Sequence, residues 1–285
     1  MTDNTHNEER HFAKARGAKR HAVEGRQLRE LAELGLDDFG RSGGCGGRQQ
    51  TMIKRLRRGN FPTGYLDKCD IEICAEDSCT EGCHFGSRRR RYQTISTAVK
   101  LMEGKEPFYR VTMVHPAWRA ARGRLSDLKP QAIRQWTYRV LSQIEDIIAV
   151  GIVEVSLNVE VDSSVHWAGE VQLVVAGTTK ERLREALAGA IPRSALAPYA
   201  KPVMVHTVSS LGRSLGYAQK RFVERRVAYL DPRTGRQGRN HLPLLQGDAL
   251  EHDLWLLAMP LGALTIACGC RRRGQKLFSR QQDEG

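Results

Sequence analysis

The sequence has no long hydrophobic run. Its longest apolar candidate, Leu254 to Ala267, contains Pro260 and is shorter than the roughly 18 residues that a membrane span needs. Residues 1–20 are charged and include no apolar segment, which is not the pattern of a secretory signal. We therefore expect a cytoplasmic chain without a membrane partner. In that reducing compartment, clustered cysteines among the seven would favour metal binding over disulfide bonds.

Acidic and aromatic residues are both scarce. Asp and Glu number 32 against 45 Lys and Arg, which gives a formal net charge of +13. Such a balance indicates a polyanionic partner, of which nucleic acid is the commonest, although a basic soluble enzyme would share it. Only 6% of the residues are aromatic, and no pair of them clusters on a predicted strand, which argues against stacking of RNA bases. The composition therefore favours DNA and a nucleoid-associated location.

The chain also lacks a phosphate-binding loop, because the glycine-rich segment Gly40 to Gly47 has no Lys-Ser/Thr ending. Hydrophobic residues make up 40%, enough to bury a core. Composition divides the chain into a flexible basic N-terminal region (1–50), a Cys-rich zinc-binding module with an arginine run (51–105), an α/β domain (106–260) and a basic C-terminal tail (261–285).

Hydrophobic periodicity within the α/β domain predicts alternating strands and helices. We expect strands at 108–114, 152–161, 170–175 and 202–208, and helices at about 127–149, 179–190, 211–227 and 249–259. A short polar connection, Asp162-Ser-Ser, suggests that the second and third strands form an antiparallel hairpin. Because the elements do not repeat as regular βαβ units, we predict an α+β fold with a central antiparallel sheet and flanking helices.

Four cysteines are closely spaced before the α/β domain. Cys69, Cys74, Cys79 and Cys83 follow one another as C-x4-C-x4-C-x3-C, with His84 adjoining. Four thiolates suit a closed, structural zinc site that leaves no position for a substrate water. Unrelated buried thiols are the alternative, and Cys268 and Cys270 are further candidate ligands.

An arginine run follows the cysteines directly. It consists of Arg88, Arg89, Arg90 and Arg91. Guanidinium groups bind phosphates well, so we predict DNA contacts along this run. A solvated basic face is the alternative.

Two further pairs of polar residues have spacings that bring them together. Glu170 and Gln172 share one face of a predicted strand, which suggests either a ligand or an ordinary amphipathic strand. Tyr217 and Lys220 share one side of a predicted helix, with Tyr217 turned away from Leu215. A phenol can attack a phosphodiester if its proton is removed and a cation stabilises the developing charge.

The order of these elements resembles the rolling-circle replication initiators, the HUH endonucleases of plasmids and phages. The resemblance covers residues 107–260 and rests on the strand with Val111-Thr-Met, Glu154 on a later strand, the strand H-W-A-G-E-V-Q-L-V-V and Tyr217-x-x-Lys220. Some plasmid initiators also have an upstream Cys-rich module. The resemblance implies a five-stranded antiparallel, HUH/RRM-like sheet, a His-hydrophobe-His pair that binds Mg or Mn, and a helical tyrosine that takes the 5′ phosphate covalently.

The chain departs from this family at the metal pair. Glu170 and Gln172 stand where two histidines are expected, His166 lies four residues earlier, and Glu154 adds a carboxylate. One hypothesis is a metal-dependent tyrosine endonuclease/ligase on single-stranded or hairpin DNA. Tyr217 would be its nucleophile, Lys220 its charge stabiliser, and Glu154, Glu170 and Gln172 its divalent-cation ligands. The other hypothesis is a catalytically inactive DNA-binding regulator or replication accessory protein.

Overall fold

The computed structural model of the protein describes residues 45–64, 66, 79–192, 202–219, 223–273 and 276–279. Its helices are α3 (Cys45–Arg58), α5 (His84–Met102), α6 (Pro130–Leu141), α7 (Lys180–Ala188), α8 (Leu211–Ala218) and α9 (Gln246–Leu257), with a short 3-10 helix at Leu125–Asp127. Its strands are β1 (Tyr109–Ala121), β2 (Ile148–Val159), β3 (Val165–Ala176), β4 (Val203–Thr207), β5 (Arg225–Leu230), β6 (Gln237–Leu242), β7 (Thr265–Cys268), β8 (Cys270–Arg273) and β9 (Lys276–Ser279).

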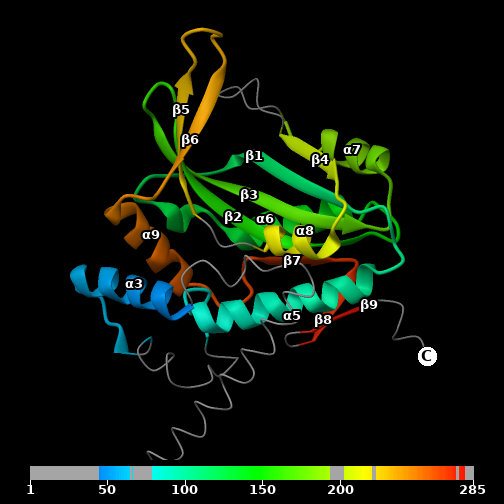
Figure 1. Ribbon diagram of the computed structural model, residues 1–285, viewed down its shortest axis with the longest axis horizontal. Helices are drawn as coiled ribbons and strands as arrows, with labels where there is room; N and C mark the ends of the chain where they lie inside the picture. The colour runs from blue at the N-terminus through cyan, green and yellow to red at the C-terminus, as the bar shows by residue number, and fades with distance from the viewer. Residues whose placement is uncertain are drawn as a thin grey trace, which may run out of the picture.

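A curled sheet with the strand order β4-β1-β3-β2-β5-β6 forms the centre of the molecule (Figure 1). From β1 to β4 the chain runs as βαββαβ, and these four strands pair antiparallel. β5 then joins β2 in parallel, over Leu157–Val159 of β2, and β7 pairs with Ala149–Ile152 of the same strand. The predicted α+β class is therefore confirmed, whereas the predicted five-stranded antiparallel sheet is wrong.

The extra strands follow from the burial of β2. Its residues from Ile148 to Asn158 are all buried, so the backbone groups along both of its edges need hydrogen-bond partners. β3 supplies one edge, and β5 and β7 divide the other. β7 lies in the predicted C-terminal tail region, and this short segment thus completes the sheet.

The larger core lies between one face of the sheet and helices α6 and α7. Strand residues of odd number, among them Val153, Val171 and Leu173, point into it and meet Ile133 of α6 and Leu183 of α7. On the second face, α5 and α8 cover only one end of the sheet, where Val150 and Val174 pack against their apolar side chains. The other end of that face is free of these helices, and it carries the polar residues described below.

α3 packs on α9, at the side of the sheet. Met52, Ile53 and Leu56 of α3 are buried against leucines of α9, and Arg55 Nε lies 2.7 Å from Asp253 Oδ2. Burial raises the pKa of Asp253, and the charge of Arg55 acts in the opposite direction.

Of the predicted N-terminal region, residues 1–44 lie outside the described part. No helix in the described part is long and apolar enough to cross a membrane.

Candidate functional site

The second face of the sheet changes character along the strands. Even-numbered residues of β2 and β3, and of β1 as far as its register shift after Val114, point to it, because side chains alternate along a strand. Beneath α8 they are apolar, but beyond the pair Ile152↔Gln172 the register brings Glu154 opposite Glu170 and Asn158 opposite His166. The predicted residues Glu154, Glu170 and Gln172 thus come together on one face, which we call the polar sheet face.

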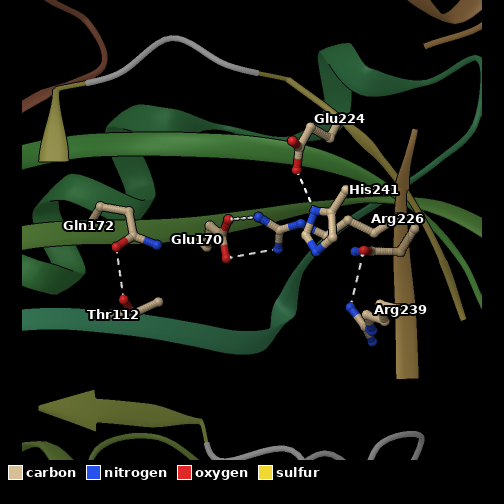
Figure 2. A network of polar contacts seen from close by, with 8 residues as sticks. Thr112, Glu170, Gln172, Glu224, Arg226, Arg239 and His241 are labelled. Carbon is tan, nitrogen blue, oxygen red and sulfur yellow. Dashed lines mark hydrogen bonds and ion pairs between the residues drawn. The ribbon is translucent and has the colours of Figure 1, made fainter. Parts of the chain in front are cut away.

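Glu170 is held by an arginine of the neighbouring strand β5. Arg226 Nη1 lies 3.1 Å from Glu170 Oε2, and Nη2 contacts Glu170 Oε1, so the pair is bidentate (Figure 2). Burial alone would lower the pKa of Arg226. The hydrogen bond and charge of Glu170, together with the charges of Glu154 and Glu224, raise this pKa by more, so the net shift is upward. Arg226 is therefore a fixed cation between the carboxylates.

Gln172 has its own partner on β1. The Thr112 hydroxyl donates to Gln172 Oε1 at 2.8 Å, with both side chains buried (Figure 2). Both oxygens of Glu170 accept from Arg226, and the described residues contain no group of three or more His, Cys, Asp or Glu that could hold a metal ion. As arranged, Glu154, Glu170 and Gln172 do not fit a magnesium or manganese ion.

Further carboxylates of this face also pair with basic side chains. Glu160 lies 3.5 Å from Arg239 Nη2 and 3.7 Å from His166 Nε2, and His241 Nδ1 contacts Glu224. Arg239 Nη1 also donates to Asn158 Oδ1 at 3.2 Å. Burial is the main cause that lowers the pKa of His166, and Arg119 and Arg239 lower it further against the charge of Glu160.

Tyr217 lies on α8, at the border of the polar sheet face. Ser210 caps the helix by accepting from Arg213 N, and Leu215 and Ala218 are fully buried against the sheet, whereas Tyr217 is 43% exposed. This agrees with the predicted orientation away from Leu215. The guanidinium carbon of Arg110 lies 4.9 Å from the centroid of the Tyr217 ring, which is cation–π distance. Lys220 lies outside the described residues.

Two of the four predicted zinc ligands meet at the start of α5. Cys79 and Cys83 are buried, and their sulfurs lie 3.3 and 3.5 Å from the place that a Cβ on Gly86 would take. Cys83 Sγ also accepts a hydrogen bond from Gly86 N at 3.4 Å. Cys69 and Cys74 lie outside the described residues.

The other candidate cysteine ligands and the arginine run have separate environments. Cys268 is buried in the larger core and Cys270 in the cluster beneath α5 and α8. Of the run Arg88–Arg91, Arg91 joins α5 to α8, since its Nη1 donates to Gln219 O at 3.1 Å. The side chains of Arg88 and Arg89 are outside the described part.

Sequence reasoning missed two arginines of this face, Arg226 and Arg239, and also Arg110, which opposes Val174 at the end of the sheet beneath α8. The helix predicted over 211–227 includes Arg226, but the structure has α8 at the start of that stretch and the beginning of β5 at its end. A signal for this was present, because Asp231-Pro-Arg-Thr-Gly235 has turn residues between two short runs, as in a hairpin. Comparison of the chain with protein-family models, curated proteins and solved structures gives no match.

Proposed function

We propose that the protein binds single-stranded DNA on the polar sheet face, as a non-enzymatic regulator or replication accessory protein. The observation that carries this proposal is the pairing of carboxylates on that face with arginines: Glu170 pairs with Arg226 and Glu160 with Arg239, while Glu224 contacts His241. The two arginines offset the charge of Glu160 and Glu170 and so reduce the repulsion of phosphates, and the chain has a net charge of +13 to attract them. This proposal needs no divalent cation.

Side chains at the α8 border of this face also suit a flexible strand. Arg110 and Tyr217 offer a guanidinium and an exposed ring side by side, and single strands bind where backbone phosphates and stacked bases find such groups together. An α-helix and adjoining strands hold both groups, so the surface is preorganised.

The test is equilibrium binding of a labelled single-stranded oligonucleotide. Arg110→Ala should weaken binding at least about threefold, because it removes one phosphate-binding group and the cation beside Tyr217. Arg184→Ala removes the same charge from the exposed side of α7, on the opposite face, and should leave binding nearly unchanged. Equal effects of the two variants, or no binding by the parent protein, would overturn the proposal.

A nicking and joining activity is the second candidate, and the exposure of Tyr217 beside Arg110 favours it. The phenol oxygen would bond to phosphorus, the P–O3′ bond would break, and the phenol proton would pass to the leaving 3′ oxygen. We expect no covalent adduct on a denaturing gel with either Mg or Mn. An adduct that Tyr217→Phe abolishes would establish this second candidate instead.

We also propose that Cys79 and Cys83, with Cys69 and Cys74, hold one structural zinc ion. The support is the proximity of two buried sulfurs at the start of α5. Elemental analysis of protein purified without chelator should give about one zinc per chain, and Cys79→Ser with Cys83→Ser should lose it and destabilise the fold around α5. A zinc content equal to that of the double variant would contradict this.

A further inference from the structure

The hairpin of β5 and β6 extends beyond the rest of the sheet. β5 pairs with β2 only through Arg225–Val227, whereas β5 and β6 pair with each other along their full length, from Arg225↔Leu242 to Leu230↔Gln237. The outer part of this hairpin is a two-stranded ribbon that projects away from the sheet (Figure 1, yellow-orange). Such ribbons are only marginally stable by themselves, so a projecting one calls for a physical explanation.

The ribbon has a well-defined turn. Asp231 N donates to Arg236 O, and Gly235 N donates to Asp231 O, both at 2.8 Å. The Asp231 carboxylate accepts from Arg233 N at 2.8 Å, which is the main cause that lowers its pKa. Gly235 has φ +64, a left-handed conformation that suits glycine. These bonds fix the tip in one conformation.

The ribbon is also packed across its two strands. Tyr229 pairs with Gly238, and its ring lies so close over this glycine that a Cβ there would meet ring carbon Cζ at 2.5 Å. The ring thus covers the glycine and stiffens the outer half of the hairpin.

The charge of the ribbon is almost entirely positive. Between Arg225 and Leu242 the sequence has five arginines and one acidic residue, Asp231, whose carboxylate is bound within the turn. Arg226 and Arg239 pair with carboxylates of the sheet, so the cations of the tip carry the charge that a partner would meet. Arg233 and Arg236 at the tip are exposed. Tyr229 is 45% and Leu230 is 55% exposed, so apolar surface lies between the charges. The ribbon therefore matches a partner that has phosphates on both sides of a surface with apolar and hydrogen-bonding groups.

We infer that this ribbon is an arm that lies in the major groove of duplex DNA next to the bound single strand. The inference deepens the proposed function and rests on it, because the proposed function supplies the single strand that adjoins the duplex. A B-DNA major groove is about 12 Å wide and admits a two-stranded ribbon. Beyond the pairing with β2, each strand continues for three residues, about 10 Å at roughly 3.3 Å per residue, and the turn lies past them. The projecting part is therefore comparable in length to the width of the groove, and it places Arg233 and Arg236 near the phosphates. The major groove of duplex RNA is too narrow for such an arm.

The experiment compares two double variants with equal charge. Arg233→Ala with Arg236→Ala removes the tip cations, and Arg182→Ala with Arg184→Ala removes two exposed cations from α7 on the far side of the sheet. The probes are a single-stranded oligonucleotide and the same strand adjoining a DNA duplex. The tip variant should bind the duplex junction at least about tenfold more weakly than the parent protein and lose about two units of salt slope, while it binds the single strand as before. The α7 variant should match the parent protein.

The outcomes separate the arm from the proposed function. If the tip variant and the α7 variant bind the junction equally well, the inference that the ribbon binds duplex DNA is overturned. Single-strand binding by the parent protein would then still support the proposed function. If the parent protein binds duplex DNA through the tip but does not bind the single strand, the proposed function is overturned and the arm stands. Equal, tip-dependent binding of an RNA duplex would overturn the major-groove geometry.

Discussion

Arg226 retains 22% exposure of its side chain, whereas its partner Glu170 retains 8%. The pair is therefore unequally solvated: loss of the arginine would leave a buried carboxylate, but loss of the carboxylate would leave a cation that still reaches water. Removing one partner of a buried ion pair leaves the other charge buried without a counter-charge. The stability lost in this way exceeds the net stability that the intact pair provides. Arg226 thus stabilises the polar sheet face and occupies both oxygens of Glu170.

Arg226→Ala should lower the free energy of unfolding by about 2–3 kcal/mol, below the usual range for a fully buried pair because Arg226 is partly solvated. Urea denaturation measures this. Adding Glu170→Gln in the same chain should restore most of the loss, because it removes the uncompensated charge. If the double variant is no more stable than Arg226→Ala, the ion pair does not explain the stability of this face.

His166 predicts a pH dependence with a definite sign. Burial, followed by the charge of Arg119, lowers its folded pKa below the ordinary value of 6.5. As the pH falls below 6.5 the unfolded chain binds this proton more readily than the folded chain, so folding stability decreases. The free energy of unfolding of the parent protein should fall more between pH 7.5 and pH 5 than that of His166→Gln. Parallel pH profiles would exclude His166 as the cause.

At the scale of elements, close strand contacts decide which glycines are replaceable. A Cβ on Gly151 of β2 would lie 1.8 Å from the carbonyl oxygen of Gln172 in β3, and this backbone atom cannot move without breaking the ladder. A Cβ on Gly189, at the C-cap of α7 with φ −76, would meet nothing within 4 Å. The same substitution should therefore have opposite effects at the two positions.

Gly151→Ala should destabilise the protein by at least about 3 kcal/mol through overpacking at a buried backbone contact. Gly189→Ala should stabilise it by about 0.5–1 kcal/mol, because it restricts the unfolded chain at no cost in the folded one. Thermal and urea unfolding of both variants check this. A tolerated Gly151→Ala would show that β2 and β3 can separate locally without loss of the fold.

The elements also show what a single sequence can and cannot predict. Alternation along the sequence predicts both strands of the β2–β3 hairpin and the shared face of Glu170 and Gln172, since side-chain period is a local property. Glu154 joins them through the register of the hairpin. The partner of Glu170 could not be predicted, because Arg226 is 56 residues away in the sequence and its position depends on a parallel pairing of three residues. The helix predicted over 211–227 extended too far for a related reason: tertiary pairing of β5 overrides helical propensity there.

At the scale of the whole molecule, the net charge of +13 predicts a strong salt dependence of DNA binding, because neutralised phosphates release counterions. Arg88→Ala with Arg89→Ala should weaken binding to all DNA sequences alike and reduce the salt slope by about two units. Titrations at several salt concentrations measure both quantities. An unchanged slope would mean that these two positions of the arginine run make no phosphate contact.

The division of the outer edge of β2 between β5 and β7 has a consequence for synthesis of the chain on the ribosome. The βαββαβ portion is complete once β4 has emerged, but the outer edge of β2 stays incomplete until Thr265–Cys268 has followed β5. At about 5–20 residues per second this interval lasts several seconds. During that time β2, which is buried in the finished protein, exposes the unpaired backbone groups of its edge to neighbouring nascent chains, and this favours edge-to-edge association. Slow translation between β4 and β7 should therefore reduce the soluble yield, even though it changes no residue of the finished protein.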